Sequence, residues 1–317
     1  MSRESSQIHN SPTHHSRTDY PRSKPIPLFD SNFLKQLEYL SLVSRRVFRG
    51  SLLAQRRTMQ FGAGIEFADH REYTPGDDLR YLDWNIYARH GDLLLKRFQE
   101  EEDLHVYFLL DCSRSMGFGE PAKYDLARQV TAALAYIALA DLDRISVIAF
   151  ADRIVADFAL TRGKARILAL LAFLENLPLA GADTDLSAAV REFARRRQRT
   201  GLAVVVSDLF SPGGYENGLD QLRHRRYEPH VVQLHDPREA RPDMLGDVEL
   251  LDIENNGTRK VTVTERALRT YRKLFDDYQA AVATYCQNYG LGCTQATTQV
   301  RFNDLILRMM RVAGAVA

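Results

Sequence analysis

Short apolar runs alternate with longer amphipathic segments along most of the chain. The runs, which are rich in β-branched and aromatic residues, lie at 105–110 (HVYFLL), 145–150 (ISVIAF), 202–206 (LAVVV) and 231–234 (VVQL). Their length and composition predict buried strands. Apolar residues recur at helical spacing in 123–141, 166–176, 186–197 and 265–289. This alternation predicts an α/β fold, a doubly wound and mostly parallel sheet with helices on both faces.

The first hundred residues have a different character. Residues 1–30 are rich in Ser, His, Arg and Pro, with too few large apolar side chains to offset the entropy of folding, and predict a disordered polar tail. Residues 31–100 predict an extension, with a helix from Phe33 to about Phe48 followed by short strands and turns. We expect Trp84 to lie in a local core of this extension, and its charged residues to pair. Residues 101–317 form the α/β domain.

Composition excludes some functions and leaves others open. The chain is 45% hydrophobic and 26% charged with a net charge of +1, so bulk electrostatics favours neither nucleic acid nor membrane as partner. Three cysteines without CxxC spacing indicate neither a disulfide framework nor a zinc site. The apolar runs are shorter than the roughly 20 residues that cross a bilayer, and the N-terminal residues lack a secretory apolar core. We therefore expect a cytoplasmic protein without a membrane span.

Polar residues follow two of the predicted strands directly. Asp111, Ser113 and Ser115 alternate in the loop after the first strand, and Asp208 follows the strand at 202–206. Ligands bind at this carboxyl edge in open α/β sheets. Alternate loop residues can point the same way, so these oxygens, with the hydroxyl of Thr184 from a third loop, predict a site for Mg²⁺ or Mn²⁺. We expect these side chains to face solvent.

Each part of this pattern also has a purely structural interpretation. Aspartates and serines are common in turns and helix caps, so the DxSxS loop alone is weak evidence for a metal. Thr184 or Asp185 could equally cap the helix that follows. The combination of three segments is what favours the metal site.

The motifs resemble the von Willebrand factor A superfamily, whose metal-ion-dependent adhesion site combines DxSxS, a loop threonine and a strand-end aspartate in this order. The positions that match are Asp111, Ser113, Ser115, Thr184 and Asp208. The resemblance implies that hydroxyls ligate the ion, that aspartates act largely through water, and that an Asp or Glu of a partner protein completes the coordination. Leu209 stands where the family often has glycine.

A second resemblance covers the extension. The block comprises Gly62-x-Gly64-x-Glu66-Phe67, Arg71-Glu72-Tyr73-x-Pro75-Gly76-Asp77-Asp78-x-Arg80-x-x-Asp83-Trp84 and Ala88-Arg89. It is similar to the signature of the domain-of-unknown-function 58 family, in which it precedes a von Willebrand A-like domain. That resemblance implies a non-enzymatic interaction module, an adaptor or co-chaperone for a MoxR-type AAA+ ATPase or its client.

Two other functions compete with this hypothesis. A metal-dependent phosphatase of the haloacid dehalogenase type also begins with an aspartate after the first strand. That chemistry needs a second aspartate two residues later, and here Ser113 stands in that position. Nucleic-acid binding would use one of two basic clusters, Arg191 with Arg195, Arg196, Arg197 and Arg199, or Arg223 with His224, Arg225 and Arg226. Both lie at predicted helix ends, where cations complement the helix dipole.

Overall fold

The computed structural model describes residues 28–48, 61–62, 66–99, 104–181, 183–196, 199–251 and 257–315. Most of the predicted tail, residues 1–27, lies outside this part of the chain. Its last residues belong to the folded structure instead. The Phe29 ring packs 5.0 Å from that of Phe33, and the Asp30 carboxylate accepts a 2.7 Å hydrogen bond from the Phe33 N–H. The boundary at residue 30 is therefore slightly too late.

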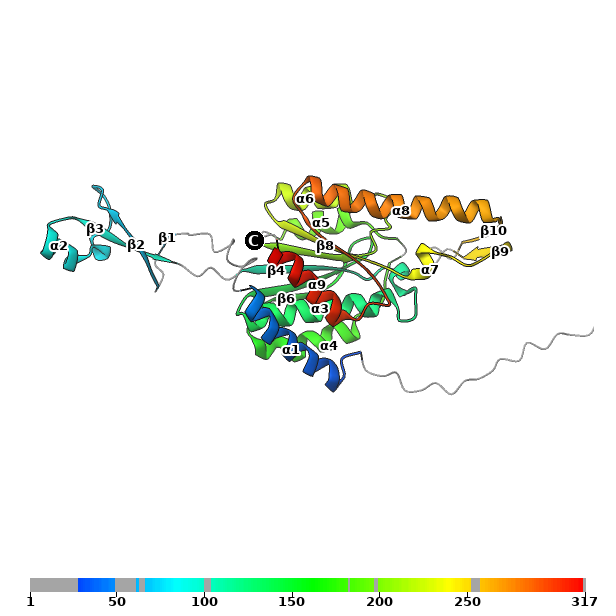
Figure 1. Cartoon of the computed structure of the whole chain (residues 1–317), viewed down its shortest axis with the longest axis horizontal. Helices are drawn as coiled ribbons and strands as arrows, with labels where there is room; N and C mark the ends of the chain where they lie inside the picture. Colours follow the sequence, from blue (N-terminus) through cyan, green and yellow to red (C-terminus); the bar gives the residue numbers. More distant parts are fainter. Residues whose placement is uncertain are drawn as a thin grey trace, which may run out of the picture.

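A six-stranded sheet forms the centre of the molecule, in the order β11-β8-β7-β4-β5-β6 (Figure 1). Its strands are β4 (His105–Asp111), β5 (Arg144–Phe150), β6 (Ile154–Arg162), β7 (Leu202–Ser207), β8 (Glu228–His235) and β11 (Gly292–Thr297). All neighbours pair in parallel except β6, which is antiparallel to β5. The predicted fold class, an α/β fold with a doubly wound and mostly parallel sheet, is confirmed.

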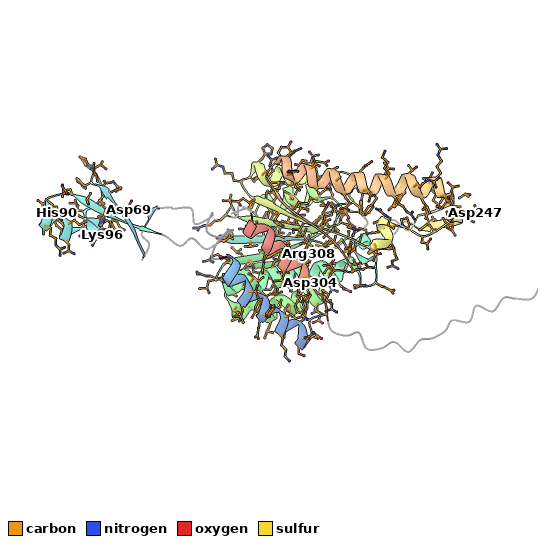
Figure 2. All side chains as sticks on the ribbon, viewed as in Figure 1. Asp69, His90, Lys96, Asp247, Asp304 and Arg308 are labelled. Carbon is orange, nitrogen blue, oxygen red and sulfur yellow. The ribbon has the colours of Figure 1, made fainter. Side chains whose placement is uncertain are left out.

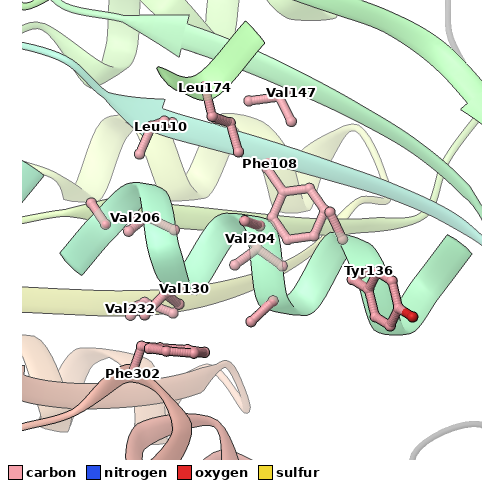
Figure 3. Packing of buried hydrophobic residues seen from close by; sticks show 14 of the residues in the cluster. Phe108, Leu110, Val130, Tyr136, Val147, Leu174, Val204, Val206, Val232 and Phe302 are labelled. Atoms are coloured by element: carbon pink, nitrogen blue, oxygen red, sulfur yellow. The ribbon is translucent and has the colours of Figure 1, made fainter. Parts of the chain in front are cut away.

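Helices cover both faces of this sheet (Figure 1). One layer holds α1 (Ser31–Phe48), α3 (Lys123–Ala140), α4 (Ile167–Asn176) and α9 (Phe302–Ala315). The other holds α5 (Leu186–Ala194), α6 (Glu216–His224) and α8 (Glu265–Asn288). Because side chains alternate along a strand, Phe108 and Leu110 pack with the first layer, and Tyr107 and Leu109 with the second. Figure 3 shows Phe108 beside α3 in the first layer.

Several elements were not predicted from the sequence. The strands β6 and β11 lie at the two edges of the sheet, and β9 (Gly246–Leu251) pairs with β10 (Thr258–Val263) in a separate antiparallel ribbon. The short helix α7 (Pro237–Ala240) follows β8. One-turn helices η2 (Arg114–Gly117) and η3 (Lys164–Arg166) occur in loops. Edge strands are half exposed and carry polar residues, so they lack the continuous apolar run that marks the inner strands.

Helix α1 belongs to the main domain, which corrects the predicted division of residues 31–100. It packs against α9 and α3, and its residues Phe33, Leu37 and Leu40 are buried in the first core layer. The Phe33 ring lies 4.7 Å from that of Phe302. The extension is thus an insertion between α1 and β4. Periodicity alone shows that a helix has an apolar face but does not identify the element that covers it.

The insertion contains a three-stranded antiparallel sheet in the order β1-β3-β2 (Figure 1). Its elements are β1 (Phe61–Gly62), β2 (Glu66–Glu72), η1 (Leu79–Tyr81), α2 (Trp84–His90) and β3 (Leu94–Gln99). Side chains of Asp69, His90 and Lys96 mark its charged surface in Figure 2. As expected, charges pair: Arg71 holds Asp77 with two hydrogen bonds of 2.7 and 2.6 Å.

The expectation that Trp84 is buried is wrong. This side chain is 61% exposed, and its ring packs edge to face with that of Tyr87, which is itself 45% exposed, with ring centroids 6.1 Å apart. Among the side chains of this insertion whose burial the structure describes, Leu82 and Leu95 are the buried apolar ones. A sheet of three short strands has too little volume to enclose an indole, so the tryptophan remains on its surface.

The three cysteines are free thiols. No helix in the described part of the chain combines the length and apolar character needed to span a bilayer.

Candidate metal centre

The loop after β4 brings two hydroxyls together. The Oγ atoms of Ser113 and Ser115 are 3.0 Å apart, and the Ser113 N–H donates a 2.9 Å hydrogen bond to Asp111 Oδ1. Cys112 turns away into the core, where its Sγ donates to the Phe150 carbonyl at 3.2 Å. Alternate residues of the loop therefore face the same side, as the motif spacing predicts.

The second loop of the site follows β7, which lies beside β4 in the sheet. Ser207 at the end of β7 donates a 2.6 Å hydrogen bond to Asp111 Oδ2 and so joins the two strand ends. The next residue, Asp208, accepts a 3.0 Å hydrogen bond from the Phe210 N–H through Oδ1. Ser207 was not among the predicted site residues, although its place directly before Asp208 at a strand end is a usable signal.

Thr184 lies in a third segment at the same edge. The Ala180 N–H donates to the Cys112 carbonyl at 2.8 Å, which holds this segment against the loop after β4. The Ser211 hydroxyl donates to the Thr184 carbonyl at 2.6 Å, which ties it to the loop after β7. Asp185 caps α5 by accepting from the Ala188 N–H at 2.8 Å. Capping thus accounts for Asp185 and leaves the Thr184 hydroxyl for another role.

The site is buried, which corrects the expectation of solvent-facing side chains. Asp111 and Ser113 have no exposed surface, Asp208 is 1% exposed and Thr184 is 4% exposed. Only Ser115 is partly accessible. The loops fold over the strand ends instead of projecting from them, so the side chains of the motif point inward.

Burial has an electrostatic consequence for Asp111. It raises the pKa of this carboxyl to about 7, and the negative charge of Asp208 adds to the effect, against hydrogen bonds from Ser207 and Ser113 that lower it. The hydrogen bonds from Ser207 and Ser113 therefore do not fully balance the negative charge of the Asp111 carboxylate, and a nearby cation would stabilise its ionised form.

A cation that the sequence analysis missed already contacts Asp208. Lys123, the first residue of α3, has a fully buried side chain. Its Nζ donates to Asp208 Oδ2 at 2.6 Å and to Glu239 Oε1 at 2.5 Å. Burial alone would lower the pKa of Lys123, but these two carboxylates raise it, so the amine is held as ammonium. A lysine in the first turn of a helix opposes the helix dipole, and that anomaly could have flagged it.

Glu239 is held in place by hydrogen bonds within α7 and its N-cap. It lies in α7, whose capping box joins Asp236 and Glu239, with the Asp236 N–H donating to Glu239 Oε2 at 2.8 Å. The Thr298 hydroxyl donates to Asp236 Oδ2 at 3.1 Å, just beyond the end of β11. Hydrogen bonds thus extend from the candidate site along the carboxyl edge of the sheet.

Leu209, directly after Asp208, adopts a backbone conformation that favours glycine. Its φ angle is 64°, in the left-handed region that disfavours a side chain. The side chain is only 2% exposed and packs in the second core layer, and the Leu209 carbonyl accepts a 2.6 Å hydrogen bond from Tyr278. Packing of the buried side chain thus offsets the strain of this conformation.

The donor set fits a hard divalent cation. Two carboxylates and hydroxyls from three loops supply the oxygen ligands that Mg²⁺ and Mn²⁺ prefer. Within the described residues no cluster of three or more His, Cys, Asp and Glu side chains forms a metal cage. A site rich in hydroxyls would leave an ion electrophilic toward an external carboxylate.

Three arginines of the two basic clusters have local partners. Arg196 lies 3.1 Å from Asp157, and Arg223 lies 2.7 Å from Asp220 with its guanidinium 3.9 Å above the Tyr289 ring. Arg225 donates to the Ala194 carbonyl at 3.3 Å. Arg197 lies outside the described residues. These contacts give Arg196, Arg223 and Arg225 structural roles.

Comparison with known proteins identifies one family. The model of the family described as protein of unknown function DUF58 matches residues 69–282. Uncharacterized protein Rv1480 of Mycobacterium tuberculosis is 28% identical over 266 residues, covering 81% of this chain and 80% of the relative. Uncharacterized protein MAV169 of Mycobacterium avium is 29% identical over 123 residues, covering 38% of this chain and 72% of the relative.

Solved structures with similar arrangements include BatB from Bacteroides thetaiotaomicron, with a TM-score of 0.41 and 14% identity, covering 68% of this chain and all of that one. An aerotolerance-related membrane protein from Bacteroides fragilis has a TM-score of 0.41, 16% identity and the same coverage.

Proposed function

The chain belongs to the DUF58 family, and from the geometry of its own site we propose that it is a metal-dependent protein-interaction module. A Mg²⁺ or Mn²⁺ ion, held among Asp111, Ser113, Ser115, Thr184 and Asp208, would grip an Asp or Glu side chain of a partner protein. The ion would supply positive charge to bind that external carboxylate. The residues of this chain orient the ion and its waters and take no chemical step, so we propose a non-enzymatic role.

One observation carries this proposal. The ends of β4 and β7 are hydrogen-bonded to each other through Asp111, a buried carboxylate whose negative charge is only partly balanced by its neighbours. Asp111 bonds to Ser113 in its own loop and to Ser207 from the neighbouring strand, and its pKa is raised to about 7. A buried carboxylate of this kind is stabilised by a cation close by. The hydroxyls of Ser113 and Ser115 converge beside it.

We further propose that the partner is a MoxR-type AAA+ ATPase or a client of that enzyme. The family resemblance implies this partner class. An adaptor of this kind needs a fixed scaffold and a recognition site, and the six-stranded sheet with its carboxyl edge offers both.

Calorimetric titration of Mg²⁺ and Mn²⁺ tests the metal site. Asp111→Ala should abolish binding, because it removes the most buried carboxylate of the cluster, and Ser113→Ala should weaken it. Asp243→Ala is the control, since this exposed aspartate lies after α7 and outside the cluster. Metal affinity that is unchanged in Asp111→Ala would refute the site.

A binding assay with a MoxR-type ATPase tests the mechanism. Association should be strong in Mg²⁺, lost in EDTA, and lost in Asp111→Ala under both conditions. Binding that persists in EDTA would separate recognition from the metal and would refute the proposed grip.

A further inference from the structure

A permanent positive charge occupies one side of the proposed metal centre. The Lys123 ammonium has no exposed surface and lies 2.6 Å from Asp208 Oδ2, on one of the carboxylates assigned to the ion. Its second contact, at 2.5 Å, is with Glu239 Oε1 from α7. The lysine cannot swing into solvent without depriving the buried Asp208 and the largely buried Glu239 of their counter-charge.

This arrangement changes what a divalent ion would meet. Asp208 is already neutralised by the ammonium, so less of its negative charge remains to attract a second cation. The ammonium also repels the ion directly, and with little water between the charges the repulsion is only weakly screened. Asp111 is thus the carboxylate of the cluster whose charge is still available to the ion.

We propose that Lys123 is a tethered counter-cation that sets the affinity of this site for divalent metal, holding it well below what the two aspartates alone would provide. This inference rests on the proposed metal site and adds the residue that tunes it. A weakly held ion with few anionic ligands keeps more of its charge for an incoming carboxylate. Lys123 would in this way favour ternary binding with an acidic partner over tight binding of metal alone.

A purely structural lysine is the competing explanation. In that case the ammonium only links Glu239 of α7 to Asp208 at the end of β7. Removing it would change stability without tightening the binding of metal. The two explanations differ in the sign of the effect on metal affinity, so they can be separated by titration.

The test is calorimetric titration of Mg²⁺ and Mn²⁺ alone into the full chain. Lys123→Met keeps the length of the side chain and removes its charge, and should tighten metal binding by at least about tenfold. The single variant leaves Asp208 and Glu239 unpaired, so it could fail to fold. The double variant K123M/E239Q removes one charge of each sign, preserves the net charge, and releases Asp208, and it too should bind metal more tightly. Lys260→Met, an exposed lysine in β10, is the control and should change nothing.

The outcomes distinguish this inference from the proposed function. Tighter binding in K123M or the double variant supports the inference, even where the unmodified protein binds too weakly to detect. Unchanged or weaker binding in the folded double variant overturns it, while metal binding by the unmodified protein leaves the proposed function standing. Absence of metal binding in every folded variant overturns both.

Discussion

Two regions of this molecule use the same kind of ion pair in opposite surroundings. In the inserted three-stranded sheet, Arg71 and Asp77 meet through two short hydrogen bonds with the arginine side chain 41% exposed. At the carboxyl edge of the main sheet, the side chains of Lys123 and Asp208 are 0% and 1% exposed. Water screens the first pair and weakens its contribution, whereas the second depends entirely on its partners.

The comparison shows that the region with the most recognisable sequence motif is not the region whose charges matter most for stability. The inserted sheet carries the more distinctive motif, with its only tryptophan on the surface. The carboxyl edge is less conspicuous in sequence, yet it buries charges whose loss would be costly. A motif dense in charged and aromatic residues therefore does not by itself locate the core.

The largest effect is expected from Asp208→Ala. It leaves the buried Lys123 ammonium with Glu239 alone, and breaking one side of a buried pair costs about 3–5 kcal/mol. Urea denaturation in EDTA would measure the loss. Asp77→Ala in the inserted sheet is the matched variant, and it should lower stability far less because the Arg71 that it leaves behind is 41% exposed. Equal losses in the two variants would mean that burial does not distinguish the pairs.

Leu209 should show an effect of packing opposed by backbone strain. Leu209→Ala removes a buried side chain and should cost about 2–5 kcal/mol. Leu209→Gly removes slightly more, but it also relieves the left-handed strain at φ 64°. The glycine variant should therefore be no less stable than the alanine variant in thermal or urea unfolding. A glycine variant that is clearly less stable would show that this conformation carries no strain.

The pH dependence of stability should isolate Asp111. Its folded-state pKa of about 7 lies above the ordinary value of an aspartate, so the native state binds the proton more tightly than the unfolded chain. In EDTA, stability should fall as pH rises from about 4 to about 7, by at least ~1 kcal/mol from this group, because ionisation is penalised only in the native state. Asp111→Asn should lose this slope and be more stable than the unmodified protein above pH about 7. Parallel pH profiles for the two proteins would contradict the raised pKa.

The smallest effect is expected from Trp84→Ala. An indole that is 61% exposed contributes little core packing, so the loss should stay below about 1 kcal/mol. Metal affinity should not change. Chemical denaturation monitored by circular dichroism would measure this directly. If partner binding falls while stability is kept, the inserted sheet is a recognition surface, and a loss of several kcal/mol would mean that the ring is buried in solution.

The inner strands and the larger helices could be predicted because burial on both faces leaves a continuous apolar run, as in β4 and β7. Strand β6 could not, since its residues alternate between half-buried and exposed and include polar side chains. The closeness of Asp111 and Asp208 was predictable for a similar reason: the loops after two neighbouring parallel strands, β4 and β7, lie side by side whatever their separation in sequence.

The sequence could mark Lys123 as unusual at the start of a helix, but it could not identify the partners of this side chain. A lysine at the start of an amphipathic helix ordinarily faces solvent, and its partners Asp208 and Glu239 lie far along the chain. Only the order of the strands places β7 and α7 beside the first turn of α3. Burial of the whole site had the same origin, because the folding of loops over a sheet edge depends on tertiary contacts that periodicity does not record.

The packing of α1 against α9 has a consequence for folding during synthesis on the ribosome. The Phe33 ring is covered by Phe302, and almost all of the described chain is synthesised between them. The apolar face of α1 therefore remains without its α9 partner while the sheet assembles. During that time α3 covers it only in part. Until α9 is synthesised, this exposed apolar face is a target for holding chaperones. The inserted sheet is made of strands close in sequence and can form before then.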